Sequence, residues 1–135
     1  MKLSTGMSFT ALAAATAFLL GGCADPAATT HAVHLGHDAA QSVDVAMRTG
    51  QHLAIVDDDF NASIGDGWSI VGEPDPEILR FDGEGVVLDD PQAVGGGGIY
   101  SFDYVAVGAG TTTITIEYSY RGDVRFESVV AVTVD

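Results

Sequence analysis

Residues 111–120, with the sequence TTTITIEYSY, decide the fold class. In this segment Ile114, Ile116, Tyr118 and Tyr120 alternate with more polar residues, so that one side of the segment is apolar and the other is polar. Alternation with a period of two is typical of a strand in an antiparallel sheet that buries one face. Residues 99–107 (IYSFDYVAV) and 125–134 (RFESVVAVTV) show the same period on either side. The C-terminal part of the chain therefore predicts three strands in succession.

Five shorter apolar segments precede these strands, at residues 42–47, 52–56, 68–71, 78–81 and 86–88. The last two flank Asp82-Gly83-Glu84-Gly85, which by composition predicts a turn. Seven to eight short strands with turn signals at this spacing predict an all-β fold, an antiparallel β-sandwich. No helix of useful length is predicted after the first 22 residues.

The first 22 residues have the composition of an export signal. They carry a single charge, Lys2, and are almost wholly apolar from Ala11 to Leu20. An apolar run of this length is too short to span a bilayer as a helix, but it fits the core of a signal peptide. The sequence Leu20-Gly21-Gly22-Cys23 resembles the lipobox of bacterial lipoprotein precursors. That resemblance implies cleavage before Cys23 and attachment of a lipid to its thiol.

The chain accordingly divides into a signal peptide (residues 1–22), a flexible tether (residues 23–31) and a β-sandwich domain (residues 32–135). The tether lacks periodicity and would join the lipid to the domain. Cys23 is the only cysteine, so no disulfide can form within the chain. We expect an exported, monomeric protein of the cell envelope that is held to a membrane by its lipid anchor.

The mature chain is strongly acidic. Once Lys2 is removed with the signal peptide, four arginines remain against 19 acidic residues, which is a net charge of −15 with histidine neutral. Nucleic-acid phosphates would be repelled by this charge, so a nucleic-acid partner is excluded. Electrostatic adsorption to an anionic bilayer is excluded for the same reason.

Three segments between the predicted strands, residues 57–67, 89–98 and 121–124, do not resemble ordinary hairpin turns. The first fits the pattern N-P-T-T-G-Y-x-W at Asn61, Gly65 and Trp68, with Ser63 in place of a threonine. The second fits G-x-G-G followed by x-x-x-F, and the strand after it fits A-x-x-x-G-x-x-x-x-x-x-x-Y; the matching residues are Gly95, Gly97, Gly98, Phe102, Ala106, Gly110 and Tyr118. With these motifs, residues 32–134 resemble the chagasin-like inhibitors of papain-type cysteine proteases.

This resemblance implies an immunoglobulin-like sandwich with a wedge of three loops at one end, which fills the protease cleft. The first loop would cross the catalytic cysteine of the protease, and the other two loops would line the sides of the cleft. The implied protease-binding residues are Asn61, Ala62, Ser63, Ile64, Gly65, Gly95, Gly96, Gly97, Gly98, Tyr120, Arg121 and Gly122. A protein of this kind is not an enzyme, and we expect no cofactor.

Several positions depart from the family pattern. In the first loop Ala62 replaces proline, Ile64 replaces a threonine and Asp66 replaces tyrosine. The third loop of the family carries Arg-Pro-Trp, whereas here Arg121 is one position out of register and the Pro-Trp pair is missing. Because aromatic and arginine side chains dominate most interfaces, the loss of this tryptophan is expected to lower the affinity for a protease.

Two other functions stay open on the sequence alone. The first is a non-inhibitory envelope lipoprotein in which an immunoglobulin-like domain serves adhesion or as a scaffold. The second is a carbohydrate-binding module, for which only Trp68 and the tyrosines could stack against sugars. The alternation of these aromatic residues points them inward, which disfavours the carbohydrate-binding function.

No metal site is predicted. Asp57, Asp59 and Asn61 have the spacing with which an EF-hand loop begins, but Ala62 stands where that loop requires glycine and Trp68 where it requires glutamate. An EF-hand is therefore excluded, and only a loose calcium site within residues 57–59 stays open.

The sequence also lacks a catalytic constellation. Cys23 is consumed by lipidation, and Ser63 lacks the glycine and the strand–turn–helix context of a nucleophile elbow. His31, His34 and His37 recur every third residue, a spacing that alternates faces on a strand, so we expect solvated histidines that do not converge.

Overall fold

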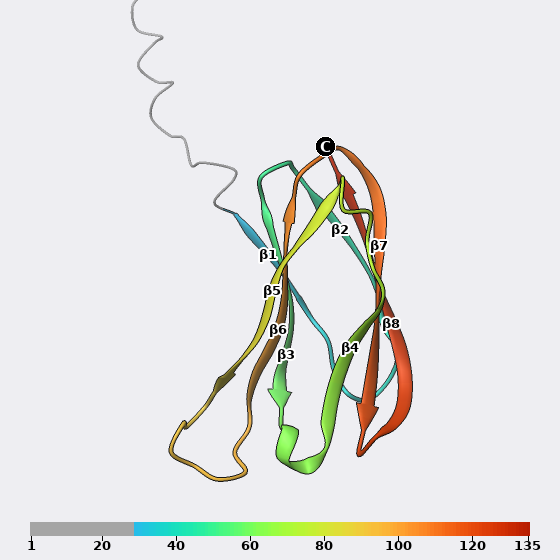
Figure 1. Ribbon diagram of the computed structural model, residues 1–135. Helices are drawn as coiled ribbons and strands as arrows, with labels where there is room; N and C mark the ends of the chain where they lie inside the picture. The colour runs from blue at the N-terminus through green and yellow to red at the C-terminus, as the bar shows by residue number, and fades with distance from the viewer. Residues whose placement is uncertain (1–28) are drawn as a thin grey trace, which may run out of the picture.

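The computed structural model describes residues 29–135, which form two four-stranded sheets packed face to face (Figure 1). The predicted all-β sandwich is therefore confirmed, with eight strands. No helix among the described residues is long and apolar enough to cross a membrane. The strands are β1 (Thr30–His34), β2 (Ser42–Met47), β3 (His52–Phe60), β4 (Asp66–Gly72), β5 (Leu79–Leu88), β6 (Gly98–Ala106), β7 (Gly110–Tyr120) and β8 (Asp123–Val134), and a 3₁₀ turn, η2 (Ala62–Ile64), lies between β3 and β4.

The strand order is β1-β3-β6-β5 in one sheet and β2-β8-β7-β4 in the other. Four of the pairings are antiparallel as predicted, but β1 pairs with β3 and β2 pairs with β8 in parallel. The reason is that β1 and β2 do not form a hairpin with each other. The segment between them crosses from one sheet to the other, so each strand adds to the edge of a different sheet.

The core lies between the sheets and includes the apolar residues predicted from the alternation. The fully or nearly buried members from the last three strands are Phe102, Tyr104, Ala106, Ile114, Ile116, Tyr118, Val130, Val132 and Val134. Trp68 of β4 joins them, as expected for a core tryptophan. One face of each of these strands is thus largely removed from water, which is the main favourable term in folding.

The turn predicted at residues 82–85 is wrong, because β5 runs through it without reversing. Both halves of β5 pair with the same strand, β6, and the register shifts only between Phe81 and Gly83. Gly83 has a φ of 141°, a conformation that glycine adopts freely. A glycine in this conformation supports a β-bulge as readily as a turn, and here it bends an exposed edge strand.

The two ends of the sandwich differ in character (Figure 1). The β3–β4, β5–β6 and β7–β8 connections lie at one end, drawn at the bottom of the figure. The start of β1 and the C-terminus lie toward the other end. β1 begins at Thr30, two residues before the predicted domain start at Ala32. Cys23 and the predicted signal peptide lie outside the described residues.

Candidate functional site

The first loop comprises residues 61–65 and is shorter than predicted, because β3 extends to Phe60 and β4 begins at Asp66. Asn61 caps the short turn η2: its side-chain Oδ1 accepts a hydrogen bond from the backbone N–H of Ser63 at 2.9 Å. Gly65 ends the turn with a φ of 111°, which favours glycine. The loop thereby presents the exposed residues Ala62, Ser63 and Ile64.

The second loop comprises residues 89–97. A backbone hydrogen bond from Asp89 to the Gly97 carbonyl, at 3.0 Å, closes its base. Val94 is fully exposed, and Gly95, next to it, has a φ of 78°. Gly95 and Gly96 are exposed and Gly97 is half-buried, so three of the four consecutive glycines belong to this loop.

Gly98 does not belong to the loop, in contrast to the expectation that all four glycines line a protease. It is a buried residue of β6, paired with Leu88 of β5. A Cβ at this position would lie only 2.4 Å from the carbonyl oxygen of Val87. Close approach of two backbones therefore explains this glycine, and its role is structural.

The third segment is a tight hairpin turn, which corrects the prediction that it is not an ordinary one. Tyr120 pairs with Asp123, so only Arg121 and Gly122 form the turn. Their φ angles are 54° and 85°. Positive φ at both central residues is typical of the type I′ turn, whose twist matches that of the adjoining strands.

Hydrogen bonds join the three segments, with the first loop in the middle. On one side, the Asn61 side-chain Nδ2 donates to the carbonyl oxygen of Gly95 at 3.1 Å. On the other side, the backbone N–H of Arg121 donates to the Gly65 carbonyl at 2.8 Å, and its Nε donates to the Ile64 carbonyl at 3.3 Å. Figure 1 shows the same order, with η2 between the β5–β6 loop and the tip of the β7–β8 hairpin. The structure thus brings the three predicted segments together at one end of the sandwich, apart from the buried Gly98.

Asp66, which in the sequence is only a departure from the family pattern, anchors the first loop through hydrogen bonds. The residue is 8% exposed, and its carboxylate accepts hydrogen bonds from the Asn61 backbone N–H at 2.8 Å and from the Tyr118 hydroxyl at 2.7 Å. The pKa of Tyr118 is raised well above its usual range. Burial is the largest cause, and this hydrogen bond to Asp66 is the next largest. The available signal was the period of two, which places Asp66 on the same inward face as Trp68.

Asp57 is a second buried carboxylate, at the position where the sequence left a loose calcium site open. One of its oxygens contacts two protein side chains. Asp57 is 4% exposed and accepts the Trp68 indole N–H at 2.7 Å, while His37 Nε2 lies 2.5 Å from the same oxygen. No three His, Cys, Asp or Glu side chains converge on a metal-sized site within residues 29–135. The expectation of a solvated His37 is wrong, because its ring stacks on Tyr118 with centroids 4.7 Å apart.

A comparison with protein families shows to which family this chain belongs. Residues 47–134 match the family described as chagasin family peptidase inhibitor I42. The chain belongs to the chagasin family. This confirms the resemblance found in the sequence, and the matched range contains all three loop segments. The family consists of protease inhibitors rather than enzymes, as expected.

Solved structures share the fold of this chagasin-family chain at low sequence identity. EhICP2, a cysteine protease inhibitor from Entamoeba histolytica, is 18% identical and superimposes with a TM-score of 0.61, covering 79% of this chain and 96% of its own. Amebosin is 20% identical with a TM-score of 0.53, covering 78% and 98%. PbICP-C, solved in complex with falcipain-2, is 19% identical with a TM-score of 0.55, covering 78% and 99%. No curated protein matches the sequence.

Proposed function

We propose that this protein inhibits papain-type cysteine proteases by inserting the first loop into the active-site cleft, with the second loop and the β7–β8 hairpin on either side. We further propose that it acts as an exported lipoprotein, anchored to a membrane through Cys23. The observation that carries the first proposal is the set of hydrogen bonds that joins the first loop to Gly95 on one side and to Arg121 on the other. Membership of the chagasin family supports the same function.

A preorganised wedge reduces the entropic cost of binding. Loops that are ordered before they meet a partner lose less conformational freedom in the complex. Here the first loop is tied to both neighbours, and Asp66 holds its base to the buried Tyr118. Its small exposed side chains, Ala62 and Ser63, let the backbone approach a catalytic cysteine closely.

The hairpin offers a replacement for the missing Pro-Trp pair. Tyr120 is half-buried, and the guanidinium carbons of Arg121 and Arg125 lie 5.1 and 5.6 Å from the centre of its ring. Tyrosine and arginine are enriched among the residues that contribute most to protein interfaces. In this proposal, the cluster of Tyr120, Arg121 and Arg125 contacts one wall of the cleft in place of the tryptophan found in the family.

Inhibition kinetics test the proposal. The chain from Ala24 onward, which contains every strand of the sandwich, is titrated against papain and a cathepsin-like protease. The substitution Ser63→Trp places a bulky side chain at the centre of the wedge and is expected to raise the inhibition constant about thirtyfold or more. Ala109→Trp is the matched control, because Ala109 is a small exposed residue in the β6–β7 connection at the opposite end.

The result that overturns the proposal is equally clear. A folded chain that inhibits neither protease at roughly 10 µM, where a ligand of micromolar affinity would be nearly saturating, is not an inhibitor of these enzymes. In that case the non-inhibitory adhesion or scaffold function takes precedence. If the parent chain does inhibit, an equal effect of Ser63→Trp and Ala109→Trp would show that the loop end is not the contact surface.

A further inference from the structure

One side of the sandwich is open. β4 is an edge strand of one sheet and β5 an edge strand of the other, and within residues 29–135 no strand pairs across the space between them. A cavity of about 520 Å³ lies in this opening. Its walls include Trp68 of β4, Phe81 of β5 and Tyr100 and Tyr104 of β6. The cavity is separate from the three loops and is not used by the proposed inhibitory function.

The cavity is negatively charged. Glu73, which directly follows β4, and Glu84 of β5 both line it, whereas none of the described residues that line it is Lys, Arg or His. Neither glutamate takes part in an ion pair with another residue in the range 29–135. The Tyr100 hydroxyl donates a 2.5 Å hydrogen bond to Glu84 Oε2, which fixes the position of this carboxylate beside an aromatic ring.

Tyr104 supplies an independent indication of a ligand. The residue is 1% exposed and lines the cavity, and its hydroxyl has no hydrogen-bond partner among the described residues. Burial is the largest cause that raises the pKa of Tyr104, and the charges of Glu73 and Glu84 raise it further. Both carboxylates therefore act on this side chain. A buried hydroxyl without a partner is unfavourable, and nearly all buried polar groups in proteins are paired.

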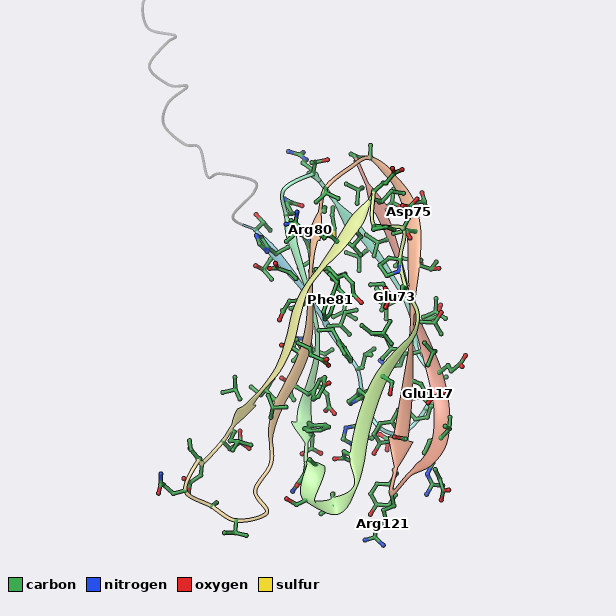
Figure 2. The ribbon with its side chains drawn as sticks, in the orientation of Figure 1. Glu73, Asp75, Arg80, Phe81, Glu117 and Arg121 are labelled. Atoms are coloured by element: carbon green, nitrogen blue, oxygen red, sulfur yellow. The ribbon has the colours of Figure 1, made fainter. Side chains whose placement is uncertain are left out.

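The walls suit a cation with an apolar stem. Figure 2 shows the side chains of Phe81 and Glu73 pointing toward one another across the opening between β5 and β4. The Phe81 ring meets the Tyr104 ring edge-on, with centroids 5.5 Å apart. Aromatic faces attract ammonium and guanidinium groups, and carboxylates bind them by charge-assisted hydrogen bonds. An anionic ligand would be repelled by both glutamates.

We propose that this cavity binds a primary ammonium or guanidinium group carried on a short apolar stem. The cation lies between Glu73 and Glu84, and the stem packs against Phe81 and Tyr100. The same chemistry is offered by a free diamine and by a lysine or arginine side chain of a polypeptide, so the test includes both sources. The proposal does not depend on protease inhibition.

Calorimetric titration of the chain from Ala24 onward tests this site with three probes. Agmatine represents a free amine, N-acetyl-lysine amide represents a peptide side chain, and N-acetyl-norleucine amide has a similar stem without the charge. We expect saturable binding of at least one cation at a dissociation constant of millimolar order or below, and no binding of the norleucine analogue. Absence of saturable binding of both cations at roughly 10 mM, where a millimolar ligand would occupy most of the site, overturns the proposal.

Two variants locate the binding. Glu73→Gln removes one charge and is expected to weaken cation binding about tenfold, the usual effect of losing a charged hydrogen-bond partner. Glu117→Gln is the matched control: Glu117 lies on β7 between the inward-facing Ile116 and Tyr118, so it faces away from the core. If both variants bound the cation equally weakly, the binding would be due to the overall negative charge of the chain and not to this cavity. That result would overturn the proposal. Glu73→Gln should inhibit proteases as well as the parent chain, so the two functions fail independently.

Discussion

Single residues decide how the three loops meet. Gly65 is the clearest case, because it stands between the first loop and the hairpin with a φ of 111°. A Cβ at this position would lie 2.6 Å from the Arg121 Cγ and 2.9 Å from the Arg121 backbone nitrogen. Glycine is therefore required both by the backbone conformation and by the close contact with Arg121. The contact with Arg121 could not be read from the sequence motif.

Gly65→Ala is expected to push the hairpin away from the first loop. The substitution combines a strained φ with the loss of the Arg121 N–H to Gly65 carbonyl hydrogen bond, so we expect a destabilisation of about 1–3 kcal/mol. Urea unfolding followed by Trp68 fluorescence measures it, since Trp68 is the only tryptophan. Inhibition should weaken as well, because the wedge loses its fixed shape.

Gly85→Ala is the control for this prediction. Gly85 lies in β5, and a Cβ there would meet nothing within 4 Å and would not sit at a positive φ. Its substitution should change both stability and inhibition little. Equal stability of the Gly65→Ala variant and the parent chain would show that the contact with Arg121 is dispensable.

At the scale of elements, β6 and β7 carry three tyrosines whose hydroxyl groups are held in the protonated form. Burial is the largest cause for each, and it raises the pKa of Tyr100, Tyr104 and Tyr118 above the ordinary value of 10.0. For Tyr100 and Tyr118 a hydrogen bond to a carboxylate adds to this effect. The folded sheets therefore bind these protons more tightly than the unfolded chain does.

Stability should fall as the pH rises above about 10, by about 1.4 kcal/mol per pH unit for each tyrosine that stays protonated only in the folded state. The contribution is fully present below the ordinary pKa and is lost as the pH rises toward the folded-state pKa. Urea unfolding at a series of alkaline pH values, followed by circular dichroism, measures the slope.

Tyr104→Phe sharpens this measurement. It removes one titrating group and breaks no hydrogen bond, because the Tyr104 hydroxyl has no partner among the described residues. We expect the variant to be at least as stable as the parent at neutral pH and to lose stability less steeply at alkaline pH. An unchanged slope would show that Tyr104 ionises equally well in both states.

At the scale of the whole molecule, the two ends of the sandwich carry different features. The three joined loops lie at one end, and the described part of the chain begins toward the opposite end (Figure 1). In the proposed lipoprotein, the lipid at Cys23 would precede β1, which starts toward the end opposite the loops. This arrangement suits an inhibitor that must stay accessible to a protease while it is held at a membrane.

The membrane anchor is tested by Cys23→Ser. In a bacterial host that processes lipoproteins, the parent chain is expected in the membrane fraction and the variant in the soluble fraction, because the variant has no thiol to carry the lipid. Inhibition constants of the two should agree, since the loops are remote from the start of β1. A parent chain that is soluble and has the mass of the bare polypeptide would contradict the lipoprotein prediction.

The sequence by itself located every strand except β1, and in the last three strands it determined which face is buried. The period of two in residues 99–107, 111–120 and 125–134 depends only on neighbouring residues, and it placed Phe102, Ile116 and Val132 correctly in the core. The motifs around Asn61 and Gly95 likewise identified the loops, because each motif lies within a few residues of the chain.

Only the tertiary structure decided which strands are neighbours and what lies between them. Alternation shows which face of a strand is buried but not which strand lies beside it, so the parallel edges β1 and β2 and the continuous β5 were not predictable from the pattern. The burial of Gly98 and the hydrogen bond from the Asn61 side chain to the Gly95 carbonyl also depend on segments that are distant in the sequence. The physical reason is that such contacts form only when the two sheets close on a common core.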